Sequence, residues 1–363
     1  MDSLNNRIRS ALPFPLSEIG ETALESFLAL PGATEWNPSN LFLAKLSMVF
    51  DIGLPFALLG SNPSAETHRQ EIGKAIASEN YASLSCWSEL QAGALFSNWE
   101  AKVSFIKRVK GVRTPDLEAE FADAVVLDVE VTCGEIPQLH KAVKDGIENF
   151  AGALHPSDID WNLNCFMVDA SNVDELTAVF NAAVELRPNE IKEEPGRWAV
   201  RAVPLEQRDN VLGVNANKMF APEWWPSDEP SFFVTSTVLG TTSGSQVILL
   251  RSLVPTTSYI NPIRNKADRY QGNLEHPYLI ALDTYEMPRA HERIIGDLNS
   301  YFANWNHISG VMLFESRFST LVGSNEWIVS IHANPHARLS LPEEVARMAD
   351  GKRRSVGFVL SNK

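Results

Sequence analysis

The sequence has few cysteines and none of the common hydrolase signatures. Its three cysteines, Cys86, Cys133 and Cys165, are widely spaced and contain no Cys-x-x-Cys pair. This spacing argues against a disulfide framework or a zinc site, and each thiol is expected to pack as a small apolar side chain. The motifs His-Glu-x-x-His, Gly-x-Ser-x-Gly and Gly-x-x-x-x-Gly-Lys-Ser/Thr are all absent, which argues against zincin, α/β-hydrolase and P-loop chemistry.

Long apolar runs are missing as well. The longest, residues 46–60, contains Asp51 and is shorter than the roughly 20 residues that a membrane-spanning helix needs. Residues 1–20 do not contain the apolar core of a secretory signal. We therefore expect a cytoplasmic protein that has no membrane partner.

The length and the composition are those of a globular protein with two parts. The chain has 363 residues, of which 44% are hydrophobic and 21% charged. Apolar residues at helical spacing, interrupted by prolines, predict a helical N-terminal region over 1–80. Helical and strand patterns then alternate, which predicts one α/β (α+β) domain with a mixed central sheet flanked by helices over 81–350. Residues 351–363 are predicted to be a basic, flexible tail.

Charge is distributed unevenly along the chain. The net charge of -14 argues against a nucleic-acid partner, because an acidic surface repels phosphates. Residues 102–113, however, hold five basic residues and no acid: Lys102, Lys107, Arg108, Lys110 and Arg113. This cluster could neutralise phosphates at the edge of a site, although a charged edge strand that discourages aggregation has the same composition.

Two carboxylates stand out in residues 114–132. Asp116 follows Pro115 at the start of a predicted strand, and Glu130 lies in the middle of the clearest strand. There Val125, Leu127, Val129 and Val131 fall on one face, and Val126, Asp128, Glu130 and Thr132 on the other. A hairpin would bring the two carboxylates together, and like charges held that close need a cation between them. Mg²⁺ takes one or two carboxylates and completes its shell with water and phosphate oxygens. Solvated positions on the wet face of a sheet are the simpler alternative.

The order of these features resembles the PD-(D/E)xK nuclease superfamily. The resemblance rests on a helix with Ser88-Glu89-Leu90, a strand, Pro115-Asp116, and then Asp128-Val129-Glu130-Val131-Thr132. Later segments are similar to bacterial proteins with that fold. It implies a restriction-endonuclease-like core and a phosphodiesterase that depends on Mg²⁺ or Mn²⁺ and cuts DNA, in defence or repair.

The resemblance also assigns roles to individual residues. Asp116 and Glu130 would bind the metal and act in catalysis, with Glu89 assisting, while Asp128 would be a neighbouring acid. Thr132 stands where the motif has its lysine, and it has no charge with which to steady a hydroxide. A lysine from a neighbouring element would then be required, and the candidates are Lys102, Lys107, Lys141 and the more distant Lys266. The group placed to bind substrate is Lys107, Arg108, Lys110 and Thr132.

Two other functions fit the same residues. Without its lysine, the fold could serve as a catalytically inactive binding or regulatory protein, with a protein partner or a second copy of the chain. A small phosphorylated substrate would suit the negative charge better than long DNA does. A lysine ammonium within hydrogen-bond reach of Asp116 and Glu130 would favour the enzyme, whereas an empty or salt-bridged pair would favour the binding protein. Trp224 and Trp225 could stack on bases, but packing of their loop is the preferred interpretation.

Overall fold

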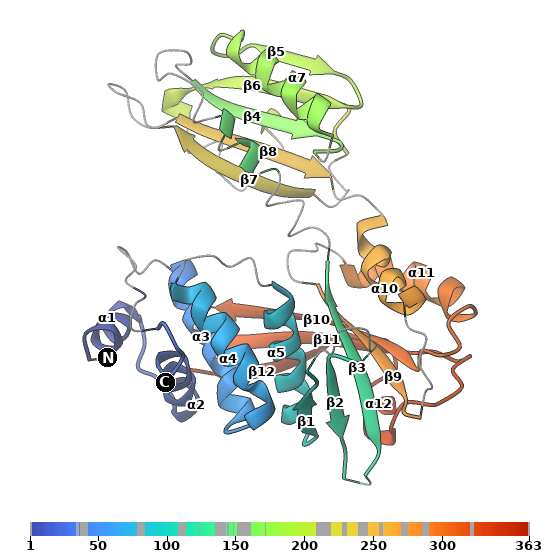
Figure 1. Cartoon of the computed structure of the whole chain (residues 1–363). Helices are drawn as coiled ribbons and strands as arrows, with labels where there is room; N and C mark the ends of the chain where they lie inside the picture. The colour runs from blue at the N-terminus through green and yellow to red at the C-terminus, as the bar shows by residue number, and fades with distance from the viewer. Residues whose placement is uncertain are drawn as a thin grey trace. The chain divides into compact units, whose positions relative to one another are not determined.

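The computed structural model divides into two compact units, which are drawn in Figure 1. Unit 1 comprises Met1–Gly134, Ile260–Tyr285 and Ala290–Lys363, and unit 2 comprises Glu135–Tyr259 and Glu286–Arg289. These boundaries differ from a division near residue 80. The residues that the structure describes are 2–33, 36, 43–77, 84–107, 114–122, 124–134, 143, 145–147, 149–150, 161–170, 172–207, 219–226, 231–238, 246–253, 257–269, 275–284, 290–319 and 323–361.

The N-terminal part of unit 1 is helical, as its apolar spacing predicts. Its elements are α1 (Asp2–Ala11), α2 (Glu18–Leu28), α3 (Leu43–Leu59), the 3₁₀ turn η1 (Pro63–Ala65), α4 (Glu66–Ala77) and α5 (Leu84–Asn98). The side chain of Ser17 caps α2 by accepting a hydrogen bond from the backbone N–H of Gly20. These helices share one hydrophobic core with the sheet of unit 1, and for this reason they belong to the same unit.

The sheet of unit 1 has seven strands in the order β1-β2-β3-β9-β10-β11-β12. The strands are β1 (Lys102–Phe105), β2 (Leu117–Glu120), β3 (Val126–Cys133), β9 (Tyr278–Asp283), β10 (Gly310–Ser319), β11 (Ser324–Ala333) and β12 (Arg354–Val359). β9 is parallel to both β3 and β10, and the other neighbouring pairs are antiparallel. Parallel neighbours need crossover connections, and the helices α10 (Thr257–Arg269) and α11 (Ala290–Phe302) precede β9 and β10, respectively. A short helix, α12 (Glu343–Ala346), lies between β11 and β12 in the sequence. The predicted mixed sheet with flanking helices is therefore confirmed.

The predicted alternation is confirmed for Leu127, Val129 and Val131, whereas Val125 precedes β3 and is exposed, and Asp128 on the opposite face is buried. Leu127, Val129 and Val131 are buried in the core that α5 also enters. Glu130 and Thr132 fall at the intervening positions and stay partly exposed. Because successive side chains of a strand point to opposite faces, the core fixes β3 on one side and presents Glu130 on the other.

The C-terminal residues form an edge strand, where a flexible tail was expected. β12 pairs with β11, and Phe358 lies edge-on to Trp327 with ring centroids 5.3 Å apart. The carbonyl of Leu360 also accepts a hydrogen bond of 2.8 Å from the N–H of Ser17, just before α2. Because the segment is rich in basic residues, its composition alone does not reveal these apolar contacts.

Unit 2 is built on a second mixed sheet, of five strands in the order β5-β6-β4-β8-β7. Its elements are β4 (Trp161–Met167), α7 (Val173–Val184), β5 (Ile191–Glu194), β6 (Trp198–Pro204), the turn η2 (Leu205–Gln207), β7 (Ser231–Val238) and β8 (Gln246–Leu253). Trp225 is buried and packs against Phe166 with ring centroids 5.1 Å apart. The packing role preferred for this tryptophan is thus confirmed.

No helix in the described ranges is long and apolar enough to cross a membrane. All three cysteines are free thiols, with Cys86 and Cys165 buried and Cys133 partly buried. Cys86 and Cys165 therefore pack as the sequence predicts.

The close contact between α2 and α3 makes a prediction about two glycines. A Cβ on Gly53 of α3 would lie 2.1 Å from the backbone oxygen of Ala23 in α2, whereas a Cβ on Gly296 of α11 meets nothing within 4 Å. We expect Gly53→Ala to lower the free energy of unfolding by about 3 kcal/mol, because backbone must move. Gly296→Ala, the matched control, should raise it by up to about 1 kcal/mol. Urea titration of both variants measures this, and equal effects would contradict the close approach.

Candidate functional site

Asp116, Glu130 and Lys266 meet in unit 1, although they come from three different elements. Asp116 lies just before β2, Glu130 lies in β3, and Lys266 lies in the last turn of α10. The Nζ atom of Lys266 donates a short hydrogen bond to Oε1 of Glu130 and lies 3.5 Å from Oδ2 of Asp116. The sequence predicted that the two carboxylates would be neighbours, and both contact the same ammonium group.

The backbone around Asp116 holds this residue in place. Its N–H donates to the carbonyl of Val129, and its carbonyl accepts from the N–H of Ile106, each at 3.0 Å. Its side-chain Oδ2 accepts a further hydrogen bond of 2.8 Å from the N–H of Val131. Asp116 is therefore tied both to β3 and to the residue that follows β1, which positions its carboxylate before any ligand binds.

Exposure differs among the three side chains. Asp116 is 2% exposed, Glu130 17% and Lys266 24%. A buried carboxylate needs a compensating charge, and here one ammonium serves two carboxylates. The formal charges of these three side chains sum to minus one.

A third carboxylate stands at the ends of the neighbouring strands. Asp283, the last residue of β9, is paired in register with Cys133 at the end of β3 and accepts a hydrogen bond of 2.7 Å from the hydroxyl of Ser88 in α5. Burial raises the pKa of the Cys133 thiol, and the charge of Asp283 raises it further. The charge of Lys266 lowers this pKa. Asp283 was not singled out in the sequence, and among the described residues it belongs to no cluster of acids arranged to hold a metal.

The two carboxylates fit a magnesium ion by their chemistry. They are oxygen donors that converge on one cationic group, and Mg²⁺ is typically held by one or two carboxylates together with water and phosphate oxygens. Among the described residues, no cluster of three or more His, Cys, Asp or Glu side chains is arranged to hold a metal. The pair therefore suits an ion that keeps part of its water shell and does not form an all-protein cage.

Glu89 and Lys102 are paired with other side chains. Oε2 of Glu89 is 3.0 Å from Nε2 of His68. Both residues line a cavity of about 450 Å³, which Lys107 also borders. Lys102 pairs with Glu120 at 3.0 Å, at the end of β2 remote from Asp116, and is largely exposed. The structure thus places Lys266, the most distant of the four candidate lysines, against the carboxylate pair.

Thr132 is in β3 on the same face as Glu130, and its hydroxyl donates a long hydrogen bond of 3.5 Å to the carbonyl of Cys133. Asp128 is buried beside His276, with 3.0 Å between Oδ1 and Nδ1. Arg108, Lys110 and Lys141 lie outside the described residues.

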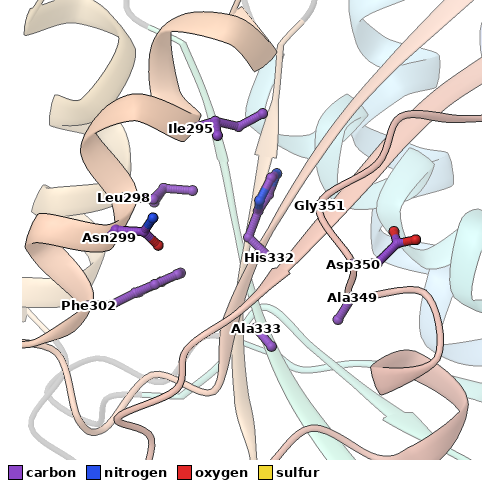
Figure 2. A pocket seen from close by; sticks show the side chains of 9 residues that line it. All are labelled: Ile295, Leu298, Asn299, Phe302, His332, Ala333, Ala349, Asp350 and Gly351. Atoms are coloured by element: carbon purple, nitrogen blue, oxygen red, sulfur yellow. The ribbon is translucent and has the colours of Figure 1, made fainter.

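A second cavity, of about 320 Å³, lies between α11 and the end of β11. Figure 2 shows Leu298 and Phe302 of α11 on one side, His332 in the middle and Asp350 on the other side. Burial lowers the pKa of His332, an effect that Asp350 opposes. Nε2 of His332 is 3.2 Å from the hydroxyl of Ser330, which is buried. The same hydroxyl lies 2.8 Å from Nδ1 of His291, so it is held between two imidazole rings.

Comparison with protein-family models, with curated proteins and with solved structures found no significant match.

Proposed function

We propose that the protein is a metal-dependent phosphodiesterase that acts on DNA and that unit 1 contains a PD-(D/E)xK, restriction-endonuclease-like core. One observation carries the proposal: the ammonium of Lys266 contacts both Asp116 and Glu130. The lysine absent from position 132 is thereby supplied by α10. DNA as the substrate rests on the resemblance, and the basic residues near β1 are compatible with it.

The arrangement of elements agrees with this proposal. The elements follow each other in the order on which the resemblance rests: helix α5 with Glu89, strand β1, Asp116 before β2, and then Glu130 in β3. Helix α10, which provides the lysine, leads into β9 next to β3. The site therefore consists of neighbouring elements of one sheet and one helix.

Each residue then has a distinct chemical role. Asp116 and Glu130 would hold Mg²⁺ or Mn²⁺, which lowers the pKa of a bound water and polarises the scissile phosphate. Lys266 steadies the attacking hydroxide and the negative charge that develops on the phosphate oxygens. The backbone contacts of Asp116 keep its carboxylate at a fixed position, so little reorganisation is needed during the reaction.

The rival function, an inactive fold that binds a partner, is favoured by the same contact. An ammonium that permanently neutralises two carboxylates is a structural ion pair, and the acidic surface is unfavourable for DNA. The two functions differ in one measurable property, because only the enzyme needs to admit a divalent cation to the pair.

Calorimetric titration with Mg²⁺ and Mn²⁺, together with plasmid nicking in the same buffers, tests the proposal. We expect the wild type to bind metal and to nick, and we expect Glu130→Gln to weaken binding by about tenfold or more and to abolish nicking. Glu25→Gln, on the exposed side of α2, removes the same charge far from the pair in sequence and should change neither. A wild type that neither binds metal nor nicks DNA would refute the enzyme and leave the binding protein.

A further inference from the structure

One face of the unit 2 sheet carries buried polar groups that the protein itself does not satisfy. Asn164 of β4 is 0% exposed, and in the described part of the chain neither its Nδ2 nor its Oδ1 has a hydrogen-bond partner. Nε of Arg201 in β6 is buried and lacks a partner in the same sense. Buried polar groups in folded proteins are nearly always hydrogen-bonded, and leaving one unpaired costs about 1–3 kcal/mol.

The strand register places these groups together. Asn164 is paired directly with Arg201, and on its other side it is paired with Leu249 of β8, two residues before Arg251. Residues paired across strands, and residues two apart along one strand, share a face. Arg201 and Arg251 therefore flank Asn164 on a single face of the sheet.

Asn162, on the same face, is an asparagine whose side-chain amide is hydrogen-bonded. It is also 0% exposed, but its Oδ1 accepts from the N–H of Val247 at 2.9 Å and its Nδ2 donates to the carbonyl of Pro204 at 3.2 Å. Two residues further along β4, Asn164 has the same burial and none of these bonds. The lack of hydrogen bonds to the Asn164 amide is therefore specific to its position beside the two arginines.

Arg201 forms no ion pair with any residue in the described ranges. Burial lowers the pKa of Arg251. Glu193 of β5 is on the same face, but its carboxylate accepts a hydrogen bond of 3.0 Å from the indole N–H of Trp224. Two partly buried guanidinium groups beside an apolar cluster of Phe166, Leu249 and Trp225 are suited to an oxyanion.

We propose that this face of unit 2 binds a phosphate monoester group, with Arg201, Arg251 and Asn164 as its partners. The guanidinium groups and the amide N–H bind the anionic oxygens. Oδ1 of Asn164 is an acceptor and needs a donor from the ligand, which the P–OH of a protonated phosphate supplies. Inorganic phosphate and a small organic phosphate share this chemistry, whereas sulfate and a phosphodiester have no such hydroxyl. The site is independent of the proposed nuclease activity, because its residues all lie in unit 2.

Titration calorimetry of the full chain with inorganic phosphate, glycerol phosphate and sulfate tests the proposal, at about pH 6, where phosphate keeps a P–OH group. We expect both phosphates to bind at least about tenfold more tightly than sulfate, which matches them in shape but lacks the donor. Glycerol phosphate that binds more tightly than inorganic phosphate would identify an organic phosphate as the ligand, and the reverse order would identify the free ion. Equal affinity for phosphate and sulfate, or no binding of either phosphate, would overturn the proposal.

Variants separate this site from general charge attraction. Arg201→Gln should weaken phosphate binding by about tenfold or more, and Arg187→Gln, an equal change of charge at an exposed position of unit 2, should leave it unchanged. Asn164→Leu should abolish the preference for phosphate over sulfate. It should also raise the thermal midpoint of the ligand-free protein, because an apolar side chain replaces an unsatisfied amide. A lowered midpoint, or equal losses in Arg201→Gln and Arg187→Gln, would count against the site.

Discussion

Replacing Lys266 with methionine is expected to reduce plasmid nicking by about 100-fold or more, because the variant lacks the cation that steadies the attacking hydroxide. Methionine keeps most of the apolar stem and removes only the ammonium. Asp116 and Glu130 then face each other without this ammonium, and Asp116 is almost fully buried. Breaking a buried ion pair in this way should lower the free energy of unfolding by about 3 kcal/mol.

The same variant should respond to metal more strongly than the wild type does. In the wild type an incoming cation competes with the ammonium for the two carboxylates, whereas in Lys266→Met this competitor is absent. Mg²⁺ should therefore raise the thermal midpoint of the variant more than that of the wild type, since a ligand that binds only the folded state stabilises it. This comparison does not require activity, so it also tests metal binding in a protein that does not cut DNA.

Lys102→Met is the matched control for Lys266→Met. Lys102 was a candidate for the same role, but its ammonium pairs with Glu120 on the exposed edge of the sheet. Exposed ion pairs contribute little to stability, so this variant should unfold and nick much as the wild type does. A Lys102→Met variant that loses nicking while Lys266→Met retains it would show that the structure indicates the wrong lysine. If Mg²⁺ changed the thermal midpoint of neither the wild type nor the two variants, the proposed metal site would be refuted.

The carboxylate pair could be predicted from sequence because its causes are local. The alternation of Leu127, Val129 and Val131 fixes the face on which Glu130 lies, and the proline before Asp116 marks the start of β2. Antiparallel pairing of β2 with β3 then brings the two acids together. Each step depends on residues fewer than about 20 positions apart, where periodicity and turn chemistry are informative.

The contact of Lys266 could not be predicted in this way. Lys266 and Glu130 are 136 residues apart, and most of the intervening chain forms unit 2. The sequence does not indicate that unit 2 is an insertion, because its strands and helix have the same patterns as those of unit 1. Similarly, the edge strand β5 has three exposed positions out of four and shows none of the apolar alternation that identifies a strand.

That the N-terminal helices share a unit with the sheet could not be predicted, for a related reason. Helical spacing in residues 1–80 shows that helices form, but not which surface they cover. In the structure a Cβ on Gly20 of α2 would lie 2.4 Å from the backbone oxygen of Leu360, and Leu16 forms a bridge with Ser361. Such contacts between the two ends of the chain are decided by tertiary packing, which a single sequence does not specify.

Asp51 of α3 makes the second prediction of a large effect. Its Oδ1 accepts hydrogen bonds from Nδ2 of Asn325 at 2.9 Å and from the hydroxyl of Ser316 at 3.3 Å. Burial raises the pKa of Asp51 to about 7, although both hydrogen bonds act in the opposite direction. Asparagine resembles the protonated carboxyl group in shape and can accept the same two hydrogen bonds, so Asp51→Asn preserves these contacts and removes the titration.

The sign of the effect follows from proton linkage. The folded protein keeps the Asp51 proton up to about pH 7, whereas the unfolded chain releases it near pH 4. The stabilisation by this group is complete below about pH 4 and is lost as the pH rises to about 7, at about 1.4 kcal/mol per pH unit. Asp51→Asn should therefore be more stable than the wild type by about 3–4 kcal/mol at pH 8, with a difference near zero at pH 4.

Urea denaturation of both proteins between pH 4 and pH 8, followed by tryptophan fluorescence, measures this difference. Asp297→Asn, at an exposed position of α11, is the control and should show no pH-dependent difference from the wild type. A difference of constant size across the range would mean that Asp51 does not titrate near neutrality in the folded protein.

The variant must be compared with the wild type at each pH because a second buried group masks the effect. Burial is the main cause that lowers the pKa of His291 to about 4. The unfolded chain takes up that proton near pH 6.5, so stability from His291 is lost as the pH falls from about 6.5 to about 4. Over this range the slopes of Asp51 and His291 have opposite signs and similar size. The wild type should consequently show a shallower profile than Asp51→Asn, whose stability should rise with pH until about 6.5, because the slopes of His291 and His332 are then no longer opposed by Asp51.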